Sequence, residues 1–73
     1  MKKLIRLDNG DWIDPFSVES IQALQESKVE DVFCFPRVVV IHGKIHSTIE
    51  LDVSVDAQKF ADELAKEIND SRE

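Results

Sequence analysis

The chain has little of what most enzymes and disulfide-stapled domains rely on. Its 73 residues contain one cysteine, two glycines, two prolines and no tyrosine. A single cysteine excludes an intramolecular disulfide and favours a reducing compartment. No apolar run approaches the roughly 20 residues that cross a bilayer, and the start of the chain has no secretory signal core. We therefore expect a single cytoplasmic domain over residues 1–73 that does not contact membranes.

The same scarcity argues against catalysis. Two isolated glycines provide no Gly-rich phosphate loop, and no Ser/His/Asp arrangement is present. Cys34 lies between two phenylalanines, which is typical of a buried structural cysteine. His42, His46 and Cys34 are too few ligands, at the wrong spacing, for a structural zinc site. We predict no enzymatic activity, no cofactor and no metal.

Charge of one sign is in excess. The formal net charge is −6, and residues 8–31 hold seven carboxylates against Lys28 alone. Such a surface repels phosphate backbones, so we expect no direct binding to nucleic acid. It suits a partner protein with a basic surface, although the same charge would also keep a small domain soluble. The candidate contact carboxylates are Asp8, Asp11, Asp14, Glu19, Glu26, Glu30, Asp31, Glu63, Glu67 and Asp70.

The first segment predicts a strand at Lys3–Leu7 and a hairpin turn at Asp8–Asp11. Asn-Gly at the two central positions is typical of a type I′ turn, a register that pairs Leu7 with Trp12. Pro15 then stops the second strand, because proline has no N–H to donate to the ladder.

The next segment is less regular. We expect a short turn near Pro15–Val18 and a strand through Leu24, although residues 17–27 also show helical spacing of apolar side chains. A charged loop at Glu26–Asp31 follows, and then a short strand of alternating phenylalanines that Pro36 interrupts.

A second hairpin is predicted over residues 37–53. A two-residue turn at Gly43-Lys44, with glycine in the first central position, fits type II′. The register set by this turn pairs Arg37 with Glu50 and gives the hairpin one continuous apolar face. It also places His42 and His46 on opposite faces. A three-residue loop would instead place the two histidines opposite each other. The two-residue register is favoured because of its apolar face and its opposite-charge pair.

The closing segment predicts an amphipathic helix over about residues 55–70, with Ser54 as the N-cap. Its apolar residues form one stripe: Ala57, Phe60, Ala61, Leu64, Ala65 and Ile68. A helix with one apolar stripe needs a sheet face to cover. The fold class is therefore α+β, an antiparallel sheet of four or five strands in residues 3–53 with the C-terminal helix packed on one face.

Three apolar residues are candidates for a contact surface. Val39 and Ile41 lie on the sheet face away from the helix, and an uncovered apolar face is typical of a homodimer or partner surface. Trp12 is expected to be at least partly buried, as Trp usually is. If it is exposed instead, it would be an interface anchor.

The segment LIRLDNGDWIDPFSVESI, followed by RVVVIHGK and the helix AQKFADELAKEIN, resembles a layout of small phage- and prophage-encoded proteins. That resemblance is architectural, and the class includes anti-CRISPR-type inhibitors that occupy a basic surface of host nucleic-acid machinery. It implies a non-enzymatic protein-interaction module that inhibits a host protein. The alternative is a self-associating, homodimeric structural or regulatory protein.

Overall fold

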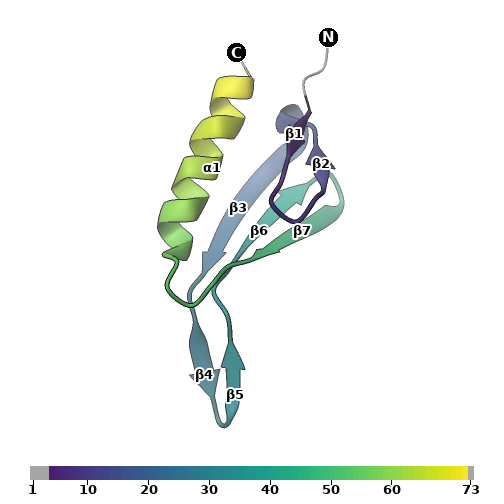
Figure 1. The fold of residues 1–73 in the computed structure, drawn as a ribbon. Coiled ribbons are helices and arrows are strands. Elements are labelled where there is room, and N and C mark those ends of the chain that lie inside the picture. The colour runs from purple at the N-terminus through teal and green to yellow at the C-terminus, as the bar shows by residue number, and fades with distance from the viewer. Residues whose placement is uncertain (1–3, 73) are drawn as a thin grey trace.

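The computed structural model describes residues 4–72 and has an α+β fold with antiparallel sheets and one C-terminal helix (Figure 1). Its seven strands form three small sheets, β1-β2, β3-β6-β7 and β4-β5, so the predicted single sheet of four or five strands is wrong. The elements are β1 (Ile5–Arg6), β2 (Trp12–Ile13), the 3-10 turn η1 (Pro15–Ser17), β3 (Val18–Leu24), β4 (Ser27–Val29), β5 (Val32–Cys34), β6 (Arg37–His42), β7 (Ile45–Glu50) and α1 (Ala57–Ser71).

The β6–β7 hairpin has the predicted register. Arg37 lies opposite Glu50 and His42 opposite Ile45, and Gly43 has a positive φ of 62°, which glycine adopts without steric cost. Val38 and Val40 therefore point to one face and Val39 and Ile41 to the other. The turn near Pro15 and the strand through Leu24 are also confirmed, as η1 and β3, and β3 pairs with β6.

The N-terminal hairpin differs from the prediction by one residue of register. Leu7 donates its N–H to the carbonyl of Asp11 at 2.8 Å, and Gly10 donates to the carbonyl of Leu7 at 2.9 Å, so the loop has three residues rather than two. Gly10 has the positive φ, 94°, while Asn9 does not. This geometry is that of a type I turn followed by a glycine bulge. The predicted strand start at Lys3 lies outside the described residues.

The register shift decides which side chains of the hairpin are buried. Ile5 pairs with Ile13 and Arg6 with Trp12, so alternation places Ile5, Ile13 and Leu7 on the core side. Trp12 is 60% exposed, and its expected burial is wrong. The amide of Asn9 explains the longer loop, because it accepts a hydrogen bond from the N–H of Asp11 and donates one to the carbonyl of Thr48 on β7.

The predicted charged loop at Glu26–Asp31 is instead mostly a strand and a tight turn. β4 and β5 form a two-stranded sheet around the turn Glu30–Asp31, in the same register as β3 and β6, and they project beyond the body of the protein (Figure 1). We call β4, β5 and this turn the arm. Pairing between arm and body breaks at Pro36, which has no N–H for the ladder. The arm gives the molecule its length of 48 Å against 23 and 19 Å in the other directions.

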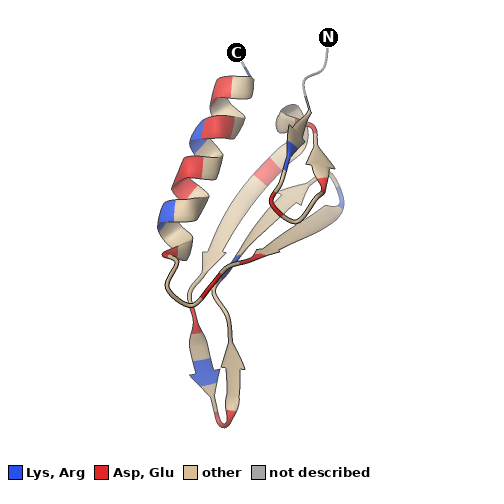
Figure 2. Cartoon of the chain, viewed as in Figure 1, with Lys and Arg blue, Asp and Glu red and all other residues tan. Residues whose placement is uncertain are grey.

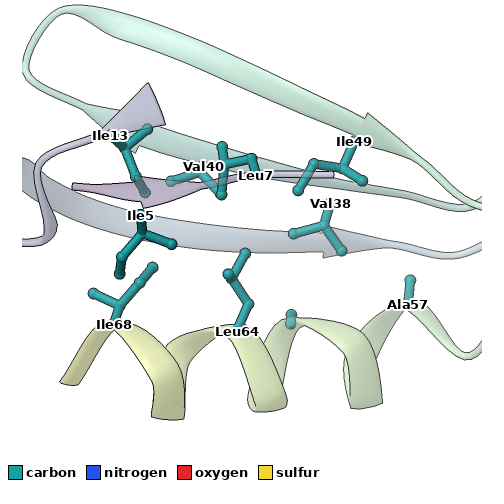
Figure 3. Packing of buried hydrophobic residues seen from close by; sticks show 10 residues of the cluster. Ile5, Leu7, Ile13, Val38, Val40, Ile49, Ala57, Leu64 and Ile68 are labelled. Atoms are coloured by element: carbon teal, nitrogen blue, oxygen red, sulfur yellow. The ribbon is translucent and has the colours of Figure 1, made fainter. Parts of the chain in front are cut away.

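The core lies on one face of the β3-β6-β7 sheet. Val38 and Val40 are fully buried there, and side chains from α1 and from the β1-β2 hairpin point toward them (Figure 3). Helix and hairpin therefore cover this face together. The buried members of the cluster are Ile5, Leu7, Ile13, Val38, Val40, Ile49, Ala57, Ala61, Leu64 and Ile68.

The helix begins later than predicted, because Asp56 rather than Ser54 is the N-cap. The carboxylate of Asp56 accepts hydrogen bonds from the N–H groups of Gln58 and Lys59 and from the side chain of Gln25 at the end of β3. The backbone hydrogen bond from Lys59, followed by the bond from Gln25, lowers the pKa of Asp56. This residue thus joins the start of the helix to the sheet.

Arg72 fixes the other end of the helix. Its guanidinium donates to the carbonyl oxygens of Pro15 and Val18, each at 2.7 Å, and is partly buried. These bonds tie α1 to η1 and to the start of β3 across more than 50 residues of sequence.

We predict that Arg72→Met lowers the free energy of unfolding by about 2 kcal/mol, because methionine keeps an apolar stem but donates no hydrogen bond. Urea denaturation followed by circular dichroism measures the change. The matched control is Lys66→Met on an exposed part of the helix, which should stay within about 0.5 kcal/mol of the wild type. Equal stability of the two variants would contradict the assigned role of Arg72.

Trp12 is the one tryptophan of the chain, so its fluorescence reports the register of the first hairpin directly. We expect acrylamide to quench it in the folded protein nearly as strongly as in urea, because 60% of its surface is exposed. Weak quenching with blue-shifted emission would instead indicate the two-residue turn and a buried indole.

Candidate functional site

The carboxylates predicted as contact residues do not form one continuous surface. In the structure they spread over the N-terminal hairpin, the start of η1, β3, the arm with its base, and the helix (Figure 2). Four of them gather beside one another, and these four define the candidate site: Asp8, Glu63, Glu67 and Asp70.

The site is an open groove between β1 and α1. Two adjoining hollows share Arg6, Glu63 and Glu67 in their walls, so together they form one groove along the helix. Its carboxylates stand on α1 and on the turn after β1, whereas Arg6 and Lys66 add two positive charges. Apolar side chains also line it: Leu4, Ile5, Leu7, Ile49, Phe60 and Leu64.

The helix geometry brings three of these carboxylates together. Glu63, Glu67 and Asp70 are separated by four and three residues, so they lie on one side of α1. Like charges at these spacings destabilise a helix, by about 0.2–0.5 kcal/mol per pair. Within residues 4–72, no ion pair neutralises any of the three.

The dipole of the helix adds to the negative potential. Asp70 lies in the last turn of α1, where the partial charge of the backbone is negative, and no basic residue lies within that turn. The C-cap residue Arg72 follows it, but its guanidinium is directed to the carbonyls of Pro15 and Val18. Anionic side chains here oppose the dipole instead of complementing it. The C-terminal half of the groove is therefore an unfavourable place for carboxylates and a favourable one for a cationic group from outside.

The other carboxylates lie away from the groove. Glu19 lines a separate hollow between β3 and α1, and Glu26, Glu30 and Asp31 belong to the arm and its base. Two have local structural roles. Asp14 caps η1 through a hydrogen bond from the N–H of Phe16, and Asp11 accepts one from the side chain of Asn9.

The three apolar candidates do not form one surface either. Val39 and Ile41 are half-buried on the open face of the β3-β6-β7 sheet. Trp12 lies on the outer side of the β1-β2 hairpin, which covers the opposite face of that sheet. The core separates them, so Trp12 cannot contribute to a contact formed by Val39 and Ile41.

The arm is the surface that sequence reasoning missed. None of its residues belongs to the core cluster. The side chains of Val29, Val32 and Phe33 in the arm are exposed, and so is that of Phe35, which follows β5. Phe33 and Phe35 contact each other edge to face, with ring centroids 5.1 Å apart. The signal in the sequence was the run Val-Phe-Cys-Phe without any charge, placed between a charged segment and a proline.

The remaining polar candidates are separated from one another. His42 and His46 lie on opposite faces of the sheet, and the ring of His42 shares a 2.7 Å hydrogen bond with the buried hydroxyl of Ser47. Among residues 4–72, no three histidine, cysteine or carboxylate side chains gather where a metal ion could bind. In the same part of the chain, no helix is long and apolar enough to span a membrane.

Comparison of the chain with protein-family models, with curated proteins and with solved structures found no match.

Replacing Asp70 should stabilise the isolated protein. We expect Asp70→Asn to raise the free energy of unfolding slightly and Asp70→Lys to raise it by about 0.3–1 kcal/mol, because a cation complements the negative end of the helix dipole. Urea denaturation at low and high salt measures both, and the gain should shrink at high salt because ions screen exposed charges. A loss of stability in both variants would show that Asp70 supports the fold.

Proposed function

We propose that this chain is a small, non-enzymatic interaction protein that binds a basic surface of a partner protein through the acidic groove between β1 and α1. The likeness to small phage-encoded proteins suggests the role of an inhibitor that covers a basic site of host nucleic-acid machinery. The observation that carries the proposal is the cluster of Glu63, Glu67 and Asp70 along one side of α1, where none of the three forms an ion pair with residues 4–72 and the helix dipole opposes Asp70 in the last turn.

The cost of this arrangement is an argument for a role in binding. Carboxylates scattered for solubility need not stand beside one another, nor at the negative end of a helix. A lysine or arginine from a partner would relieve the repulsion and gain charge-assisted hydrogen bonds at the same time. The apolar side chains that line the groove, such as Phe60 and Leu64, would contact the aliphatic stem of that side chain.

Charge reversal in the groove tests the proposal. The variant carries Glu63→Lys, Glu67→Lys and Asp70→Lys, and the matched control carries Glu19→Lys, Glu26→Lys and Asp31→Lys. Each set brings the formal net charge from −6 to zero, so the two differ in place and not in total charge. Affinity capture from a bacterial lysate, followed by titration of each purified captured protein, measures binding.

We expect a basic partner that the wild type and the control retain and the groove variant loses. Its affinity should fall steeply as salt rises, because exposed charges dominate the encounter. Equal loss in both variants would mean that total charge and not the groove governs binding. Retention by the groove variant, or affinity that does not depend on salt, would refute the proposal.

A further inference from the structure

The two strands of the arm present very different edges. Within residues 4–72, β4 and β5 pair only with each other, so each has an outer edge with unpaired main-chain groups. In β4, Lys28 stands in the middle, and Glu26 and Glu30 flank the strand on either side. In β5 and the residue after it, the run Val-Phe-Cys-Phe has no charge, and Figure 2 shows this strand without colour for charge.

Natural proteins protect open strand edges with charged side chains, prolines or covering elements. Lys28 and the flanking glutamates protect the edge of β4 in this way. β5 has no such protection until Pro36, at the base of the arm. An uncharged, exposed edge of this kind is a template for pairing with another extended strand.

The pairing inside the arm shows which main-chain groups of β5 point outward. The pair Val29–Val32 flanks the two-residue turn, and Lys28 lies opposite Phe33. The pair that closes such a turn is hydrogen-bonded, and hydrogen-bonded pairs alternate with pairs whose N–H and C=O groups point away from the partner strand. The main chain of Phe33, in the middle of β5, is therefore directed toward the open edge.

We propose that two copies of this chain associate through β5, pairing antiparallel edge to edge, so that their arms form one four-stranded sheet in the order β4-β5-β5-β4. The strand that fits an uncharged apolar edge is itself uncharged and apolar, and β5 meets that description. A two-fold axis near the middle of β5 makes the contact self-complementary, as a closed dimer requires.

Charge favours the antiparallel arrangement. A parallel pairing would place the two acidic tips, Glu30 and Asp31 of each copy, side by side. The antiparallel pairing directs each acidic tip toward the base of the other arm, where Arg37 begins β6. The two acidic tips then lie at opposite ends of the contact.

Association would also stabilise the arm, which has only two strands on its own. A single two-stranded hairpin is at best marginally stable in water, and three or more strands are needed for independent stability. Here the side chains of Val29 and Val32 are 66% and 63% exposed. Glu30 at the tip has a positive φ of 57°, a conformation that is uncommon for residues other than glycine.

Matched lysine substitutions test the edge. Val32→Lys puts a charge on β5, and Val29→Lys puts the same charge on β4, in the same cross-strand pair, on the same face and with nearly equal exposure. Neither residue belongs to the core cluster, so both variants should fold. Sedimentation equilibrium over a range of concentrations measures the dimer.

We expect the wild type and Val29→Lys to form dimers and Val32→Lys to lose at least tenfold in dimer affinity. A wild type that stays monomeric up to its solubility limit would overturn the proposal. Equal weakening by both variants would indicate packing through the apolar face of the arm, and no weakening by either would place the interface elsewhere. Both of these outcomes also overturn it.

A thiol cross-link tests the strand order. In the proposed sheet each Cys34 lies opposite Val32 of the other copy, so the two copies of Cys34 are one strand spacing and two residues apart, roughly 8 Å. The two copies of Ser27 are three spacings and two residues apart, roughly 16 Å. Ser27 lies directly opposite Cys34 within the arm. A short bismaleimide should therefore join two wild-type chains and fail to join the variant with Cys34→Ser and Ser27→Cys. Equal cross-linking of both proteins, or of neither, contradicts the order.

Salt separates this proposal from binding at the acidic groove. Two copies with a net charge of −6 each repel one another, so dimer affinity should rise as salt screens that repulsion. Binding of a basic partner should instead weaken with salt. Dimer affinity that falls with salt would show that ion pairs, and not strand pairing, hold the two copies together.

Discussion

Burial of one face of a narrow sheet is the constraint on which this structure depends. Val38 and Val40 are fully buried in the middle of the β3-β6-β7 sheet, and neither the helix nor the N-terminal hairpin covers them alone. α1 packs over β3 and β6, while the amide of Asn9 holds the hairpin to β7. A chain of 73 residues is close to the size at which a single core is marginal, so both covers are needed.

The acidic groove is a consequence of this shared covering. It lies where the helix and the hairpin meet over the core, which is why apolar residues such as Leu7 and Leu64 line it together with carboxylates from both elements. A sheet covered by one large element would have no such seam. Arg72 and Asp56 hold the two ends of the helix to β3, so the helix that carries these carboxylates is fixed relative to the sheet.

The arm follows from a different constraint, which is the missing N–H of Pro36. The pairs β3–β6 and β4–β5 have the same register. They would form one long hairpin if pairing continued through Pro36. The break separates a body that buries its side chains from an arm that does not. The two proposed surfaces therefore bind by different interactions. Charged side chains dominate the groove, whereas the arm offers unpaired main-chain groups and apolar side chains.

The sequence alone determined the features that depend on neighbouring residues. The stripe of apolar residues placed the helix to within two residues at its start, and Gly43 together with the Arg37–Glu50 pair gave the register of the β6–β7 hairpin. The residues of a turn did not determine the hairpin register where turns of two different lengths fit the same residues. Asp-Asn-Gly-Asp suits a two-residue loop, yet a contact between Asn9 and Thr48, 39 positions away, accompanies the three-residue loop that exposes Trp12.

Only the tertiary structure decided which charged and apolar side chains share a surface. The four-residue spacing of Glu63 and Glu67 places them on one side of α1, but nothing in the sequence placed Asp8 beside them or Trp12 and Val39 on opposite sides of the core. Segments distant in the chain meet because the core must be covered, and their side chains take positions that local propensity does not determine. Composition alone indicated an acidic protein with no disulfide, and folding decided where that charge is concentrated.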